Sequence, residues 1–104
     1  MAIFDDRERG FESKYAHAQE TAFKVMGRRN RLLGEWAGAL LGHSGAGLAD
    51  YAREVVRSDF EETGEEDVFR KVSRDLEGKA TEAEVRAKMH DLIEEARRQV
   101  QAGG

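Results

Sequence analysis

Three histidines, His17, His43 and His90, are the residues best suited to bind a metal ion or to move a proton near neutral pH. They stand in three separate segments, and none has a second histidine three or four residues away. The sequence HExxH, which places two zinc ligands on one face of a helix, is absent. We therefore interpret all three as surface residues and predict no metal site.

The hydroxyl and glycine residues do not form a known catalytic or phosphate-binding motif. No serine stands in the GxSxG sequence that exposes a nucleophile on a sharp turn. The glycine-rich segment GHSGAG, residues 42–47, lacks the lysine followed by a serine or threonine with which a phosphate-binding loop ends. We interpret this segment as a turn, and we predict that the protein is not an enzyme.

One segment resembles the start of a calcium-binding loop. Asp59, Glu61 and Thr63 fit its first, third and fifth positions, and a glycine follows at the sixth. The twelfth position is Arg70, a cation where the carboxylate that binds calcium with both oxygens should stand. The acidic residues 65–67 are better explained as first-turn residues that complement a helix dipole. We expect no bound metal and no cofactor.

Composition points to one small domain. The chain has 104 residues, 39% of them hydrophobic and 37% charged, with no Cys and a formal net charge of −4. The lack of Cys excludes a disulfide scaffold, and no apolar run approaches the roughly 20 residues that span a bilayer. A basic patch of Arg28, Arg29 and Arg31 is too local for a nucleic-acid binder. We predict no nucleic-acid partner and no direct membrane contact, and we interpret the patch as a solvated helix face.

Apolar residues recur with helical spacing in four segments, which predicts an all-α protein. The first helix ends at Gly42, the second runs from Leu48 to Phe60, the third spans about 65–77, and the fourth spans 82 to about 101. Short connections make consecutive helices near neighbours in a small four-helix bundle. We expect five aromatic residues to close its core: Phe23, Trp36, Tyr51, Phe60 and Phe69.

Two capping boxes mark helix starts. Thr63 with Glu66, and Thr81 with Glu84, each place a hydroxyl and a carboxylate three residues apart, so that each can satisfy a free backbone N–H group. These pairs predict the starts of the third and fourth helices.

Four glycines, Gly27, Gly34, Gly38 and Gly42, lie opposite the apolar stripe of the first helix. Glycine inside a helix costs about 1 kcal/mol relative to alanine. Two interpretations are open: a weak but tolerated solvent face, which we favour, and a hinge or a surface that another backbone approaches closely.

The first twenty residues carry an apolar stripe without an obvious partner. At about 100° per residue, Phe4, Phe11, Tyr15 and Ala22 fall within about 20° of one line. The segment is otherwise highly charged, and it buries too little surface to offset its ordering cost of about 1–2 kcal/mol per residue. We predict a flexible amphipathic arm over residues 1–18 and a four-helix domain over residues 19–102.

Long segments of the chain resemble one family, the zeta inhibitor subunit of the F-type ATP synthase of alphaproteobacteria. The similarity is carried by FDDRERGFESKY at 4–15, RRNRLLGEWAGALLG at 28–42, YAREVVRSDFEETGEEDVFRKV at 51–72 and KMHDLIEEA at 88–96. The resemblance implies a four-helix domain whose mobile N-terminal arm inserts between catalytic subunits near the rotor and blocks ATP hydrolysis. The implied partner is the catalytic head, with its alpha, beta and gamma subunits.

The resemblance also implies which residues bind. The inhibitory stretch maps onto the arm as Phe4, Asp5, Asp6, Arg7, Glu8, Arg9, Phe11, Lys14 and Tyr15. The basic patch is the candidate for secondary docking. We expect a cytoplasmic protein, held at the inner membrane through the ATP synthase, that is a monomer when free. The alternative is a helical adaptor that uses the same stripe on another partner.

Overall fold

The computed structural model describes the backbone of residues 2–59 and 65–103 and the side chains of residues 20–59 and 65–103. It contains four helices: α1 (Ala2–Leu40), α2 (Gly45–Ser58), α3 (Glu66–Asp75) and α4 (Glu82–Gln101). No strand occurs among these residues. The predicted all-α fold with four helices is confirmed.

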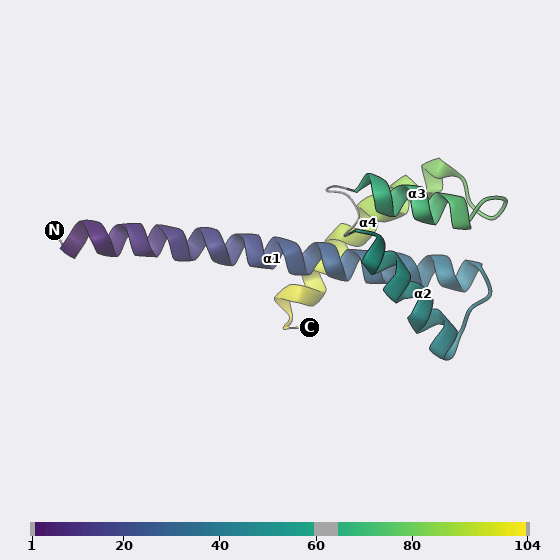
Figure 1. Cartoon of the computed structure of the whole chain (residues 1–104), viewed down its shortest axis with the longest axis horizontal. Helices are drawn as coiled ribbons and strands as arrows, with labels where there is room; N and C mark the ends of the chain where they lie inside the picture. The colour runs from purple at the N-terminus through teal and green to yellow at the C-terminus, as the bar shows by residue number, and fades with distance from the viewer. Residues whose placement is uncertain (1, 60–64, 104) are drawn as a thin grey trace.

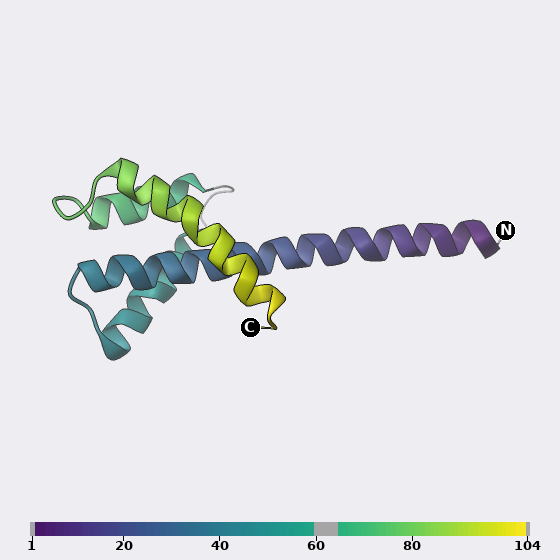
Figure 2. The same ribbon diagram turned by 180° about the vertical axis from the view of Figure 1, so that it is seen from behind.

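Helix α1 is 39 residues long and belongs only in part to the bundle. Its C-terminal half is surrounded by the other helices, whereas its N-terminal half extends away from them in both views (Figures 1 and 2). The molecule therefore measures 63 Å along its longest axis and only 25 × 21 Å across. Residues 2–19 span about 27 Å of this helix at 1.5 Å per residue. The backbone helix continues through the predicted boundary between arm and domain at residue 18.

The bundle is built around the C-terminal half of α1. Helix α2 lies in front of α1 in Figure 1, and α4 crosses behind it, as the reverse view in Figure 2 shows. Helix α3 contacts all three other helices, and consecutive helices are neighbours, as predicted. The most deeply buried core side chains come from all four helices: Leu33, Val55, Val68, Val72, Leu76 and Val85.

The start of α4 follows its capping signal. The backbone N–H of Glu84 donates to Thr81 Oγ1 at 3.1 Å, and the backbone N–H of Thr81 donates to Glu84 Oε1 at 3.3 Å. This capping box was predicted and is confirmed. Before it, Gly78 adopts φ +84°, a conformation that glycine tolerates without strain.

Helix α3 begins within one residue of its predicted start, and its predicted capping box stays a prediction. Helix α3 begins at Glu66 after Glu65, which makes no side-chain capping bond, and Thr63 lies outside the described residues. The Glu66 carboxylate accepts hydrogen bonds from Arg86 of α4 at 2.9 and 3.0 Å. Glu66 thus joins α3 to α4 through an exposed ion pair.

The segment GHSGAG is only partly a turn. Gly42, with φ +90°, ends the first helix as expected, but residues 45–47 already form the first turn of α2.

The glycine face of α1 is covered by α2, so our favoured interpretation of a solvent face is wrong for two of the four glycines. A Cβ added to Gly34 would lie 2.7 Å from the Ala52 Cα, and one added to Gly38 would lie 2.6 Å from Leu48 Cδ1. Both glycines are buried. The second interpretation, a surface that another backbone approaches closely, describes this contact. The approaching backbone belongs to α2 of the same chain.

Two of the five aromatic residues predicted for the core are buried in it. Tyr51 and Phe69 are buried, and Trp36 is partly buried against the core with the Lys88 Nζ atom 5.8 Å from its ring centre. Phe23 is 69% exposed, so its placement in the core is wrong. Phe60 lies outside the described residues.

Candidate protein-interaction surface

The predicted inhibitory residues all lie on the projecting half of α1. Residues 4–15 belong to the same continuous helix as the bundle residues 20–40, and no other helix lies beside them in Figures 1 and 2. Their side chains are outside the described set. Their role in binding remains a prediction from the sequence.

Within the basic patch, Arg29 is not a surface residue. It is 1% exposed, its Nε donates to Asn30 Oδ1 at 2.8 Å, and its Nη1 lies 3.2 Å from Glu65 Oε1. The interpretation of Arg29 as part of a solvated docking face is therefore wrong. A buried cation needs a charged partner, and Glu65 supplies it here. The ion pair connects α1 to the start of α3.

The position of Arg29 has a signal in the sequence. Val25 and Leu33 stand four residues before and after it, and both are core residues. Residues four apart share one helix face, so Arg29 must face the same way as they do.

Arg28 and Arg31 reach the surface beside a groove of about 640 Å³ between α1 and α2. We call it the α1–α2 groove. Its apolar lining comes from three helices: Phe23, Ala49, Ala52, Val56 and Val100. Every charged side chain in its lining is a cation: Lys24, Arg28, Arg31, Arg53 and Arg57.

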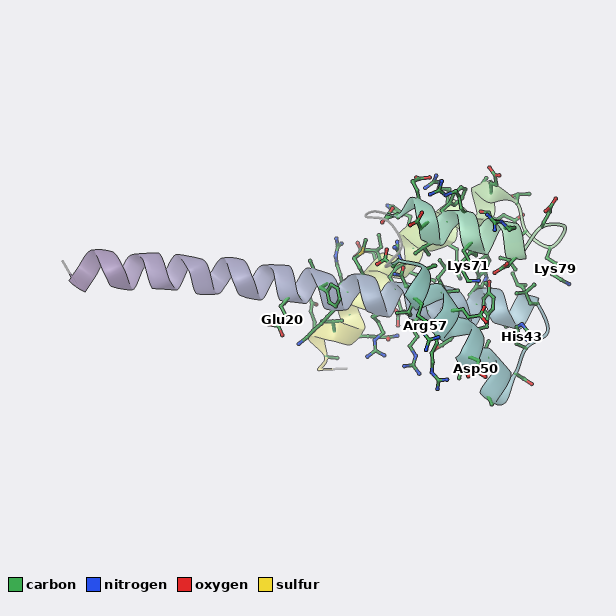
Figure 3. All side chains as sticks on the ribbon, in the orientation of Figure 1. Glu20, His43, Asp50, Arg57, Lys71 and Lys79 are labelled. Atoms are coloured by element: carbon green, nitrogen blue, oxygen red, sulfur yellow. The ribbon has the colours of Figure 1, made fainter. Side chains whose placement is uncertain are left out.

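Three of these cations have acidic partners on the surface. Lys24 pairs with Glu20 at 3.4 Å, Arg31 with Glu35 at 3.4 Å, and Arg53 with Asp50 at 2.7 Å. Arg28 and Arg57 have no ion pair among the residues whose side chains are described. Nitrogen-tipped side chains extend from the side of the bundle where Arg57 is labelled (Figure 3).

Sequence reasoning missed the α2 side of this groove. Arg53 and Arg57 stand four residues apart on α2, interleaved with Ala49, Ala52 and Val56. That alternation of small apolar and basic residues indicates a half-covered helix face. The two helices become one surface only because α2 packs on the glycines of α1.

A polar cluster lies at the far end of the α1–α2 contact. The Tyr51 hydroxyl donates to Asp75 Oδ2 at 2.8 Å, and the Lys71 Nζ atom lies 3.1 Å from the same oxygen. Burial and the hydrogen bond to Asp75 raise the pKa of Tyr51 well above its usual value. The cluster joins α2 to α3, and we assign it a structural role.

The described histidines are surface residues, as predicted. His43 is exposed and stacks on Tyr51 with ring centres 5.6 Å apart, and His90 is exposed on α4. His17 lies outside the described side chains. Within the described part of the chain, no three His, Cys, Asp or Glu side chains are grouped so that they could hold a metal ion.

A helix that crosses a bilayer must be long and apolar. Over the described residues, no helix combines the length and the apolar character needed to cross a bilayer.

Comparisons with known proteins agree with this architecture. The profile of the family described as ATPase inhibitor subunit zeta matches residues 1–99. A structure solved by NMR in solution is 51% identical in sequence, with a TM-score of 0.73, and the match covers 79% of this chain and 96% of that one. The curated proteins contain no match.

The family match includes the projecting half of α1 as well as the bundle, and the solved structure matches most of the chain at high identity. The chain therefore belongs to the ATPase inhibitor subunit zeta family.

Proposed function

We propose that this protein inhibits ATP hydrolysis by the F-type ATP synthase, and that the arm, residues 1–18, is the inhibitory element. The observation that supports this proposal is the projection of α1. About 27 Å of helix extends beyond the bundle, with no neighbouring helix along it (Figure 1). A helix in that position is available to a partner.

In this proposal the arm binds as a helix between catalytic subunits of the head, close to the rotor. A helix with its side chains is about 10–12 Å thick, so its insertion holds apart surfaces that must approach each other in every catalytic cycle. The bundle remains outside as a body too wide to follow the arm, since it measures more than 20 Å across. Hydrolysis then stops because the subunits cannot complete their movement.

The arm residues have different roles in this mode of binding. Phe4, Phe11 and Tyr15 share one face by their spacing, so we assign them as apolar anchors in the subunit interface. The charged residues around them set the rate of association and its salt dependence: Asp5, Asp6, Arg7, Glu8, Arg9 and Lys14.

Gly10 limits the affinity of the arm. A glycine inside a helix costs about 1 kcal/mol relative to alanine, so binding of the arm as a helix is less favourable by about that amount.

The direct experiment adds the purified protein to the isolated catalytic head and follows ATP hydrolysis. We expect the rate to fall with increasing protein and to reach a plateau near complete inhibition. If the protein binds the head and the rate does not change, the chain is an adaptor for this complex. If it does not bind the head, the stripe serves another partner.

A further inference from the structure

We propose that the α1–α2 groove is a second docking site, and that it binds an acidic amphipathic segment of the ATPase. The proposal goes beyond the arm, and it rests on the function proposed above in taking the ATPase as the partner. The carboxylates of that segment would pair with the groove cations, and its apolar side chains would cover Phe23. Three independent features of the groove support this site: its charge, its exposed apolar lining and its position.

The charge of the groove selects an acidic partner. The whole chain has a formal net charge of −4, yet all five charged side chains that line the groove are cations. Two of them, Arg28 and Arg57, make no ion pair among the described side chains. Arginine binds carboxylates with two parallel hydrogen bonds, so these two residues are ready partners for acidic side chains.

The apolar lining selects a protein segment. Phe23 is 69% exposed at the groove, although a side chain of this size is normally buried. A Cβ placed on Gly27 would meet nothing within 4 Å, so the groove is open above the α1 backbone at that point. An acidic helix with an apolar stripe offers both carboxylates and apolar side chains to such a surface.

The groove also lies where a partner of the arm must come close. Phe23 and Lys24 stand on α1 directly after the projecting segment, and the groove continues from there onto α2. Two contacts on one molecule reinforce each other, because the first contact raises the effective concentration of the second. The arm would then block hydrolysis, and the groove would hold the bundle against the outer surface.

The test uses the full chain with its arm intact. The variant Arg28→Glu/Arg57→Glu reverses the charge of the two groove cations that make no ion pair among the described side chains. The control Arg74→Glu/Lys79→Glu makes the same change in net charge at exposed positions that do not line the groove. Each variant is titrated against the isolated catalytic head, and its Kd and its inhibition at saturation are measured.

We expect the groove variant to raise Kd roughly tenfold, and the control to change it less than about twofold. Inhibition at saturation should be the same for both, because the arm is unchanged. If the groove variant binds as tightly as the control while the wild type inhibits, the groove proposal is wrong and the proposed function stands.

A second measurement tests the docking proposal without the ATPase, for the case in which the wild type does not inhibit and the proposed function is wrong. Isotope-labelled protein is titrated with a synthetic helical peptide whose leucine stripe is flanked by glutamates. We expect amide shifts over residues 23–31 and 49–57 that the Arg28→Glu/Arg57→Glu variant loses. If these amides do not shift with the peptide, the proposal is wrong. If they shift with phosphatidylglycerol vesicles and not with the peptide, the proposal is also wrong, and the groove binds a membrane surface.

Phe23→Ala gives an independent check with little risk to the fold, because the side chain is largely exposed. We expect weaker binding to the head with an unchanged melting temperature. Unchanged Kd in this variant would show that the apolar part of the groove does not contribute.

Discussion

Gly34 of α1 lies directly against Ala52 of α2, so close that a Cβ on Gly34 would stand 2.7 Å from the Ala52 Cα. Real Cβ atoms do not approach backbone atoms this closely, so any side chain at position 34 must push the two helices apart. This contact brings α2 over α1, and it places the cations of both helices around one groove.

The contact predicts opposite effects for two glycines of the same helix. Gly34→Ala should lower stability by about 1–3 kcal/mol, because the added methyl group overpacks the helix contact. Gly27→Ala should raise stability by up to about 1 kcal/mol, because its Cβ meets nothing within 4 Å and alanine is the better helix former. Thermal melting of both variants checks this, and equal shifts of the same sign would contradict it.

The local elements could be predicted from the sequence. The fourth helix follows from the Thr81–Glu84 capping box and the spacing of its apolar residues, and its observed bounds match the prediction. Gly42 and Gly78 mark the breaks after the first and third helices, because both adopt a positive φ. These features depend on residues close together in the chain.

The coverage of each helix face could not be predicted in the same way. Arg29 and Phe23 were assigned by residue type, one to the surface and one to the core, and both assignments are wrong. The four-residue spacing of Arg29 from Val25 and Leu33 does place it on the core face of α1. The exposure of Phe23, by contrast, depends on where α2 and α4 cross α1, and the periodicity of α1 alone does not contain that information. The groove is formed by two helices, so it has no motif in either segment.

Tyr51 makes the stability of the bundle depend on pH in the alkaline range. Its pKa is raised above the ordinary value of 10.0, chiefly by burial and then by the hydrogen bond to Asp75. The stabilising contribution of the neutral hydroxyl is complete below about pH 10 and is lost as the pH rises beyond it, because the unfolded chain then ionises first.

Tyr51→Phe isolates this contribution. At pH 8 we expect the variant to be less stable by about 1 kcal/mol, from the lost hydrogen bond. Above about pH 10 the difference should shrink, because phenylalanine does not titrate. Chemical denaturation of both proteins across this range is the measurement, and a constant difference up to about pH 11 would contradict the assignment.

Hydrogen exchange should separate the two halves of α1. Amides in residues 4–15 should exchange quickly in the free protein, since this part of the helix has no neighbouring helix and isolated helices of this length are marginal in water. Amides in residues 29–37 should exchange slowly, because side chains of this segment are buried in the core and the helix there opens only when the bundle unfolds. Slow exchange throughout residues 4–15 would mean that the arm docks on its own domain and must be released before it acts.

Within the arm, Phe11 should contribute most to inhibition. Phe11→Ala should cost about 2 kcal/mol of binding free energy, a roughly thirtyfold rise in the concentration needed for half inhibition. Glu12→Ala is the matched control, since the neighbouring position points about 100° away from the apolar stripe. The melting temperature should not change in either variant. If the two variants inhibit equally well, the aromatic stripe is not the contact surface.

Deletion of residues 1–15 tests most directly whether inhibition resides in the arm. The shortened chain keeps every core residue of the bundle, so its melting temperature should stay close to that of the full chain. Titrated into the isolated catalytic head, it should leave the rate of ATP hydrolysis unchanged at concentrations where the full chain inhibits. If the shortened chain inhibits as strongly as the full one, the inhibitory surface lies on the bundle and the arm is not required.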